Sequence, residues 1–473
     1  LIVSPGFIDT HGHSEFTLIA DGKAEGKILQ GITTEINGNC GLSAAPLLGE
    51  AFERRSIDLE ELGITDRWST FNEYFEILNK RGISLNFLTL CGHGNIRASV
   101  IGYRDIPPDE GAMNNMKMLL SDAVGQGSKG LSTGLIYPPG IYSKTEELIE
   151  LCNGLNLNSN FIYTSHMRSE GDELIESVEE VINIGIKAGV KAHVSHIKTM
   201  GKGNWHKVDR VLECLENARQ AGVDITCDRY PYIASSTDLD SILPAWDFDG
   251  GIEEELERLS NIEIQNKIRY EMRGLDDDYW KGVFISSVNR PENKWMEGEN
   301  LCDISVKEGI SPLDIFFRIV MEERARAGAI FFSMSEDNLK KFLSLPYSMI
   351  GTDSSARSFT GTTASGKPHP RGFGSLPRFI GRYVRDAGLM PLREAVRKAS
   401  YLPALTFNIE GRGLIAEGFY ADIVVFDYDK IYDTADFKEP FKKPEGMYNV
   451  FVNGVMIVKD GEFTGTLAGR ILR

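Results

Sequence analysis

Three features of the sequence predict an α/β fold, a (β/α)8 TIM-like barrel with an inserted lid and a small β-sandwich. Short apolar runs alternate with amphipathic segments of helical period, eight runs can be placed, and potential metal ligands stand where several runs end. Strands that alternate with helices form parallel sheets with right-handed crossovers, and eight such units close into a barrel. The 473 residues suffice for one barrel with smaller appendages.

The alternation is clearest in the middle of the chain. A strand at 163–166 precedes a helical segment that stops at Gly189, and a strand at 192–196 precedes another that stops at Gly222. A third strand follows at 223–227. Apolar residues at helical spacing and glycine stops are strong local signals. Five further strand candidates end at His11 and His13, at Cys40, at His93, at Gly134 and at Asp353.

Two regions interrupt this pattern. Residues 238–300 are charged and irregular and are predicted to form a lid inserted after the seventh strand. The apolar run 329–332 is a ninth strand candidate that the eight-stranded barrel does not accommodate. Residues 1–410 are therefore assigned to the barrel, and residues 411–473 to C-terminal strands of the sandwich. The Asn453-Gly454 pair between β-branched runs predicts a hairpin there. A hairpin needs partner strands, so we expect the N-terminal half of the sandwich to lie upstream of Leu1.

The charge balance narrows the class of partner. With 51 Lys and Arg against 68 Asp and Glu, the net charge is −17, which argues against nucleic acid and anionic lipid surfaces. No apolar run is long enough to span a bilayer. The six cysteines show no CxxC pairing, so we expect a reduced, cytoplasmic protein without a disulfide framework. The chain starts without Met, which leaves a targeting signal open, and its oligomeric state cannot be read.

A metal site is predicted at the strand ends. His11 and His13 alternate on a strand and so point the same way, although this pair alone more often marks the start of a polar loop than a metal site. Cys40, His166, His196 and Asp353 each occupy the last position of a predicted strand, and all such positions face one mouth of a barrel. Singly, the thiol could be a small core residue and each imidazole a satisfied polar group. Together, these N, S and O donors suit zinc.

Three other histidines receive different interpretations. His93 ends a strand and is predicted to orient a ligand rather than to bind metal. His193 precedes His196 by three positions, so it points to the opposite face and is interpreted as structural. His206 is expected on the surface.

The motifs that carry these residues resemble a known group. Residues 5–13 are similar to the first-strand signature of the amidohydrolase superfamily. The Gly-Asn-Cys-Gly segment at 38–41 is the most discriminating, because most of that superfamily places a carboxylated lysine or a glutamate there. Nearly the whole chain resembles the N-acyl-D-amino-acid deacylases (D-aminoacylases), in order, through residues 31–41, 92–94, 130–140, 165–168, 194–198, 230–232, 351–353 and 369–371.

The resemblance implies a zinc enzyme with assigned roles. Cys40, His166 and His196 would hold a tight zinc ion, and His11 and His13 a second, weaker or empty position. Asp353 would be the general base and acid, and Tyr137 would steady the scissile carbonyl. The free carboxylate of a small-molecule substrate would be gripped by Lys198 and Arg371, with Tyr230 and Ser236 nearby. The chain departs from the family in its long loop at 354–370, which puts the geometry of this clamp in question.

The expected reaction is zinc-dependent hydrolysis of N-acyl-D-amino acids to a carboxylate and a free D-amino acid. The alternatives are a dipeptidase for C-terminal D-residues, a cyclic-amide hydrolase and a non-catalytic metal-binding scaffold. Cys40 stands where the cyclic-amide enzymes have their bridging lysine, and a scaffold has no chemical need of Asp353. Side-chain and acyl preference are left open by the sequence.

Overall fold

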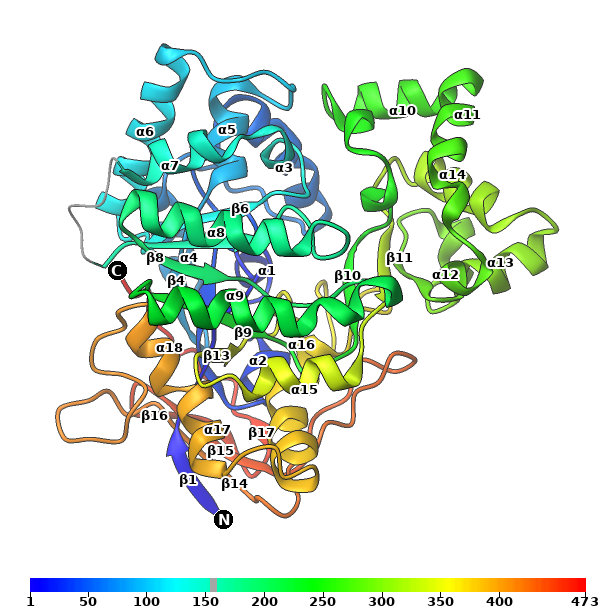
Figure 1. The fold of residues 1–473 in the computed structure, drawn as a ribbon. Coiled ribbons are helices and arrows are strands. Elements are labelled where there is room, and N and C mark those ends of the chain that lie inside the picture. Colours follow the sequence, from blue (N-terminus) through cyan, green and yellow to red (C-terminus); the bar gives the residue numbers. More distant parts are fainter. Residues whose placement is uncertain (154–159) are drawn as a thin grey trace.

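The barrel predicted from the sequence is present in the computed structural model, which describes residues 1–153 and 160–473 (Figure 1). All neighbouring strands in its two hydrogen-bonded sheets are parallel. Backbone hydrogen bonds from Thr10 to Ile350 (3.5 Å) and from Asp353 to His11 (2.7 Å) close the seam between the first and last strands. The strands are β2 (Phe7–Asp9), β3 (Ile32–Asn37), β4 (Asn86–Thr89) with β5 (Cys91–Gly92), β6 (Gly130–Gly134), β7 (Ile162–His166), β8 (Lys191–Val194), β9 (Ile225–Arg229) and β13 (Ser348–Ile350).

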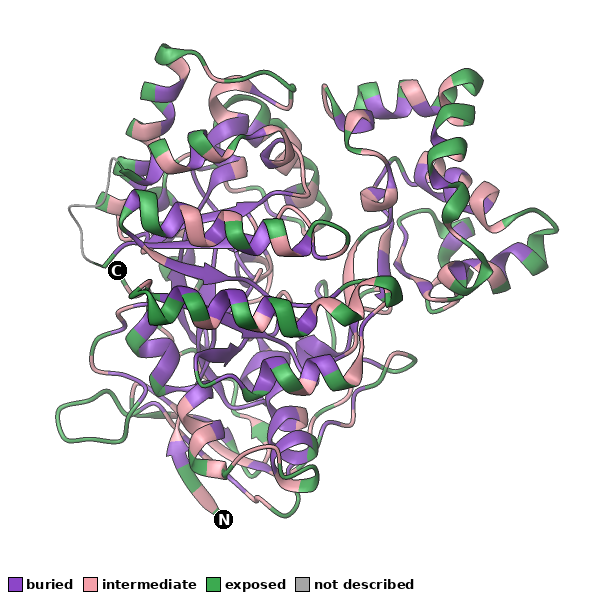
Figure 2. Ribbon diagram, viewed as in Figure 1, coloured by how far each residue is buried: buried purple, intermediate pink, exposed green. Residues whose placement is uncertain are grey.

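Amphipathic helices surround these strands, and the strands themselves are buried (Figure 2). In α8 (Leu174–Ala188) the apolar face that includes Val178 and Val181 is buried, and Gly189 ends the helix in the left-handed conformation. The other helices of the barrel are α1 (Thr17–Ala20), α2 (Glu25–Ile28), α3 (Gly49–Glu61), α4 (Phe71–Arg81), α5 (His93–Ile101), α6 (Glu110–Gly125), α7 (Thr145–Asn153), α9 (Val208–Gln220), α15 (Glu336–Ser344), α16 (Arg371–Arg378), α17 (Leu392–Ala399) and α18 (Tyr401–Thr406).

The insert between β9 and β13 has its own antiparallel sheet and its own apolar core (Figure 1). It extends past the predicted limit at Asn300, because the apolar run that the sequence could not place forms β12 (Gly328–Phe332) at the centre of this sheet. β12 pairs with β10 (Ala234–Asp238) and with β11 (Val283–Ser287). The helices of the insert are α10 (Ile252–Ser260), α11 (Ile262–Glu271), α12 (Asp277–Lys281), α13 (Leu301–Glu308) and α14 (Pro312–Glu322).

A second small sheet joins the two ends of the chain. Its strand β1 (Ile2–Pro5) pairs antiparallel with β14 (Ile423–Phe426), so assigning residues 1–5 to the barrel was wrong. The chain passes from this sheet into the barrel at Gly6, where a Cβ would lie 2.2 Å from the Thr33 hydroxyl. The predicted hairpin is confirmed: Asn453 and Gly454 both have positive φ angles between β15 (Met447–Val452) and β16 (Val455–Lys459). β17 (Glu462–Phe463) completes the sheet.

Across the described ranges, we find no helix that combines the length and the apolar character needed to cross a membrane.

Candidate metal centre

The carboxyl ends of the barrel strands open into one cavity of about 1470 Å³. Among the predicted metal ligands, His166 is the last residue of β7, whereas Cys40, His196 and Asp353 follow β3, β8 and β13 by two or three residues. The sequence had placed all four at the last strand position. These residues and His13 line the cavity, and His11 lies directly beneath them, fully buried.

Three of these residues share an unusual backbone. Cys40, His196 and Asp353 have φ angles of 53°, 36° and 51°, the left-handed region that side chains other than glycine seldom adopt. At each of these turns a backbone amide donates a hydrogen bond to a residue far away in the sequence. The amide of His196 donates to Asp228 Oδ1 (2.6 Å), the amide of Asp353 donates to the carbonyl of His11, and the amide of Gly41 donates to Ser132 Oγ. Such strain, maintained at three strand exits that meet, is typical of a functional site.

Cys40 stands between two imidazoles. Its Sγ lies 3.2 Å from His11 Nε2 and 3.4 Å from His196 Nε2. Burial opposes ionisation of the thiol, but His11 and His196 outweigh it and hold the pKa of Cys40 well below its ordinary value. A thiolate between two histidines is a donor set that zinc prefers.

His166 extends this set on the side of β7. Its ring centre lies 4.3 Å from that of His196, and burial, followed by the His196 charge, lowers the pKa of His166. Within the described residues, neither of its ring nitrogens has a hydrogen-bond partner although both are buried. A neutral imidazole with two unpaired buried nitrogens is costly unless something else binds it, so His166 fits a metal ligand.

A second group of donors adjoins the first. His13 Nε2 lies 3.3 Å and His11 Nε2 3.7 Å from Asp353 Oδ1, so His11 belongs to both groups. Arg371 Nη1 lies 2.9 Å from Asp353 Oδ2. Burial opposes ionisation of Asp353, but Arg371 and His13 outweigh it, and the pKa of Asp353 lies well below its ordinary range. Asp353 is therefore an ionised carboxylate that can accept a proton.

Comparisons with known proteins agree with this geometry. The model of the amidohydrolase family matches residues 329–457. The chain is 34% identical to the D-aminoacylase of Alcaligenes xylosoxydans xylosoxydans over all of its own length and 87% of that relative. It belongs to the D-aminoacylase family of amidohydrolases.

Solved structures of this family superpose on the whole chain. A D-aminoacylase structure concerned with a binuclear metal centre, with one-metal activation and second-metal attenuation, matches with a TM-score of 0.82 at 33% identity. The N-acyl-D-glutamate deacylase of Bordetella bronchiseptica, complexed with zinc and a phosphonate inhibitor, also matches with a TM-score of 0.82 at 33% identity. In both cases the match covers 100% of this chain and 89% of the other. The predicted family and barrel are thereby confirmed.

Of the residues that the resemblance assigns to the substrate carboxylate, Arg371, Tyr230 and Ser236 lie together, whereas Lys198 makes other contacts. Arg371, at the start of α16, stacks over the ring of Tyr230 at 4.6 Å and donates to the carbonyl of Ser236 at 3.3 Å. Lys198 is bound differently, because its ammonium contacts His196 Nδ1 at 2.7 Å and Glu170. In this D-aminoacylase relative the lysine charge is thus already paired beside the metal ligands.

Tyr137 packs against the proposed metal ligand His166. Its ring centre is 5.0 Å from that of His166, and its hydroxyl lies 3.0 Å from Thr237 Oγ1 of the insert. Burial raises the pKa of Tyr137 well above its ordinary value, so the hydroxyl keeps its proton.

Sequence reasoning missed two carboxylates in this centre. Asp228, near the end of β9, accepts hydrogen bonds from His11 Nδ1 (3.4 Å), His193 Nε2 (2.9 Å) and the His196 amide. Glu170 contacts His196 Nδ1 at 2.9 Å. The strand-end rule that found the ligands would also have found Asp228, which directly follows the predicted strand 223–227. No comparable signal marks Glu170.

The remaining histidines are placed as follows. His93 does not orient a ligand as predicted, because its Nε2 is bonded to Glu147 at 2.8 Å. His193, interpreted as structural, contacts Asp228, and Asp228 in turn accepts hydrogen bonds from His11 and from the His196 amide. His206 is exposed, as expected.

Proposed function

We propose that this protein hydrolyses the amide bond of N-acyl-D-amino acids, with zinc at the barrel mouth, to give a carboxylate and a free D-amino acid. The observation that carries the proposal is the position of Cys40 between His11 and His196, beside the ionised Asp353, in a member of the D-aminoacylase family. We infer a small substrate with a free carboxylate, and a cytoplasmic setting remains our prediction.

The family resemblance assigns one tight zinc ion to Cys40, His166 and His196 and a weaker second one to the neighbouring histidines. The geometry groups Cys40 with His11 and His196, and His166 with Glu170 and His196, so His196 is the residue common to both groups. His11, His13 and Asp353 surround the second position. His11 lies as close to Cys40 Sγ as His196 does, so His11 belongs to both proposed metal positions. Zinc, when bound, lowers the pKa of a coordinated water to about 7 and polarises the scissile carbonyl.

Asp353 moves the proton. As an ionised carboxylate it accepts a proton from the attacking water while the new C–O bond forms. It then donates that proton to the departing nitrogen as the C–N bond breaks, so the free amine leaves neutral and Asp353 is ionised again. Arg371 holds the carboxylate from the side opposite His13 and thereby fixes its orientation.

Two further side chains bind the substrate in this proposal. Tyr137 donates a hydrogen bond to the carbonyl oxygen as negative charge develops there. The guanidinium of Arg371, stacked on Tyr230, offers its remaining N–H groups to the α-carboxylate beside Ser236. Lys198 lines the cavity, but its ammonium is already paired with Glu170 and contacts His196 Nδ1, so in this proposal it positions these two side chains and Arg371 binds the α-carboxylate.

The test is hydrolysis of matched D and L substrates by zinc-loaded protein. We expect ninhydrin-reactive amine from N-acetyl-D-amino acids and at least tenfold less from the L series. Dipeptides with a C-terminal D-residue belong in the same panel, since the cavity volume admits them. Amine release from the L series alone would refute the stereochemical assignment, and release from the dipeptides alone would favour the dipeptidase.

A further inference from the structure

The cavity is larger than a metal-bound acetyl amino acid requires. Its volume of about 1470 Å³ exceeds the roughly 300–1,000 Å³ of ordinary small-molecule sites. Beyond Asp353 and Arg371 its wall continues along the loop 354–370 and the insert strand β11. The residues that line this extension therefore bear on which substrates the enzyme accepts.

Arg357 differs from the other arginines of this wall. Arg55, Arg168 and Arg326 each lie within 4.0 Å of a carboxylate. Arg54 also lines the cavity without an ion pair in the described chain, but it lies close enough to Asp238, Asp240 and Glu255 to oppose the rise in their pKa values. For Arg357 itself, no ion pair is found within the described ranges of the chain. Only its Nη1 makes hydrogen bonds there, to the carbonyls of Thr363 and Ser365, both at 3.3 Å.

The surroundings of Arg357 leave its charge uncompensated. Burial lowers the pKa of its guanidinium, and within the described part of the chain no neighbouring charge opposes this effect. The two carbonyls engage one nitrogen and leave the Nε and Nη2 donors of the planar fork without a protein partner in the described chain. A half-buried cation of this kind is unfavourable until an anion reaches it.

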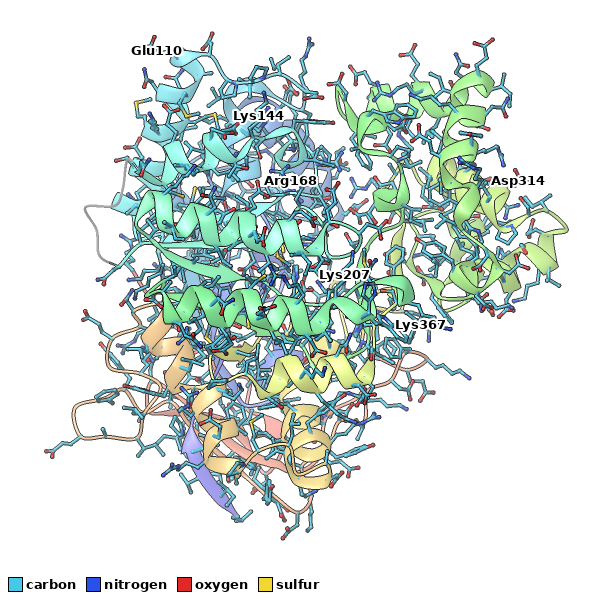
Figure 3. All side chains as sticks on the ribbon, viewed as in Figure 1. Glu110, Lys144, Arg168, Lys207, Asp314 and Lys367 are labelled. Atoms are coloured by element: carbon cyan, nitrogen blue, oxygen red, sulfur yellow. The ribbon has the colours of Figure 1, made fainter. Side chains whose placement is uncertain are left out.

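The position of Arg357 is fixed from both sides. Its carbonyl accepts a hydrogen bond from the Gly26 amide at 2.8 Å, and the preceding amide of Ala356 donates to Ser14 Oγ at 2.6 Å. On the other side, the Lys367 amide donates to the Ser286 carbonyl of β11 at 2.6 Å. Lys367 lies between the barrel and the insert (Figure 3). The guanidinium is thus held in the cavity wall where these two parts meet, and the serines at 286, 287 and 365 line the same wall.

We propose that Arg357 binds a second carboxylate of the substrate, so that the enzyme acts preferentially on N-acyl-D-amino acids with two carboxylates. The proposal rests on the proposed function. Arg371 serves the α-carboxylate, and Arg357 offers two parallel N–H donors to the second one. That carboxylate belongs either to an acidic D side chain or to a dicarboxylic acyl group. Serine hydroxyls in the same wall add neutral donors to the subsite.

The test compares substrates that differ only in the second charge. The kcat/KM values of zinc-loaded wild type are measured on N-acetyl-D-glutamate against N-acetyl-D-glutamine, and on N-succinyl-D-leucine against N-acetyl-D-leucine. We expect at least a tenfold preference for the dicarboxylate in one pair. A preference in the first pair places the second carboxylate on the side chain, and a preference in the second pair places it on the acyl group.

Substitution then assigns the preference to Arg357. Arg357→Gln should lower kcat/KM on the preferred dicarboxylate by about 10- to 100-fold and change the neutral partner less than twofold. Arg357→Lys should restore part of the preference, and Lys202→Gln, at an exposed cation of the same cavity, should keep all of it. A thermal-shift titration with the amino acid product of the preferred substrate should show weaker stabilisation of Arg357→Gln than of wild type, independently of turnover.

Two outcomes would overturn the proposal. One is an equal loss on charged and neutral substrates in Arg357→Gln, and the other is a wild type that prefers neither dicarboxylate. Hydrolysis of N-acetyl-D-leucine with no such preference refutes the Arg357 subsite alone. Failure to hydrolyse any N-acyl-D-amino acid refutes the proposed function itself.

Discussion

At the scale of single residues, charge rather than burial decides which thiol is a ligand. Cys91 is buried in the barrel, and burial raises the pKa of its thiol far above its ordinary value, whereas Cys40 lines the cavity at the barrel mouth. The pKa of Cys40 moves the opposite way, because His11 and His196 stand within 3.4 Å of its sulfur. Only a thiolate is a strong ligand for zinc, so Cys40 is the metal-binding cysteine in our proposal.

Removing this thiol should remove the metal. We expect Cys40→Ala to lose tightly bound zinc and to lower kcat/KM more than about 100-fold, since even outer residues of metal sites cost 10–100-fold. Metal analysis after dialysis and the ninhydrin assay measure the two effects. Cys302→Ala, a half-buried cysteine of the insert, should retain both metal and activity. Full zinc occupancy in Cys40→Ala would contradict the assignment.

Replacing the proposed base should separate chemistry from metal binding. Asp353→Asn keeps the size of the side chain and removes its ability to accept a proton. We expect kcat to fall about 10²- to 10⁴-fold, the usual contribution of a positioned base, while tight zinc remains. Activity within threefold of wild type would exclude Asp353 as the base.

At the scale of elements, a buried lysine fixes the barrel seam that carries two of the proposed ligands. Lys27 of α2 contacts Asp9 Oδ2 and Glu35 Oε1, both at 2.7 Å, and Thr352 Oγ1 at 2.6 Å. Asp9 in turn accepts hydrogen bonds from the amides of His11 and Thr352. One cation thereby connects the exits of the first, second and last strands, directly below the metal centre.

Lys27→Met should therefore destabilise the fold. Methionine has a similar volume, but it leaves two buried carboxylates without their cation, a change that costs about 3–5 kcal/mol. Differential scanning calorimetry should show a clear fall in the melting temperature. The matched control is Lys23→Met, because the Lys23 side chain is 45% exposed and its ion pair with Asp21 contributes at most about 1 kcal/mol. Equal melting temperatures of the two variants would contradict this role of Lys27.

At the scale of the whole molecule, the insert meets the barrel through polar contacts. Arg326 pairs with Asp58 at 2.9 Å and with Glu61 at 2.7 Å, and the Asp105 amide donates to Asp249 at 2.8 Å. The insert has a separate apolar core, and interfaces of this kind permit relative motion of the parts they join. Because the cavity lies between the two parts, their contacts influence the pocket as well as stability.

Burial makes part of this interface sensitive to pH. Burial, followed by Asp240 and Asp247, raises the pKa of Glu255 to about 8, although Arg54 and Arg258 oppose the shift. Between its unfolded pKa near 4.3 and pH 8, the folded state holds a proton that the unfolded state releases. The contribution of Glu255 to stability is therefore present at low pH and is lost as the pH rises through this window.

Glu255→Gln should remove this dependence. At pH 8.5 we expect the variant to be more stable than wild type by roughly 1 kcal/mol or more, and at pH 4 to be nearly equal to it. Thermal unfolding at both pH values measures the difference. Glu257→Gln, at an exposed position of the same helix, should follow the wild type. Parallel stability curves for Glu255→Gln and wild type would refute the prediction.

Local patterns in the amino-acid sequence predict the eight barrel strands, the hairpin at Asn453-Gly454 and the set of proposed metal ligands. These features follow from local periodicity, from turn residues and from the rule that the ends of parallel strands face one mouth. Long-range contacts, in contrast, pair β1 with β14 and place residues 329–332 at the centre of the insert sheet. They also bring Asp228 and Glu170 against the histidines. Tertiary contacts also place Lys198 in an ion pair with Glu170, whereas Arg357 has no ion pair among the residues that the structure describes. Most of these features depend on contacts between segments far apart in the chain, and no local pattern encodes the partner of a charge or of an edge strand.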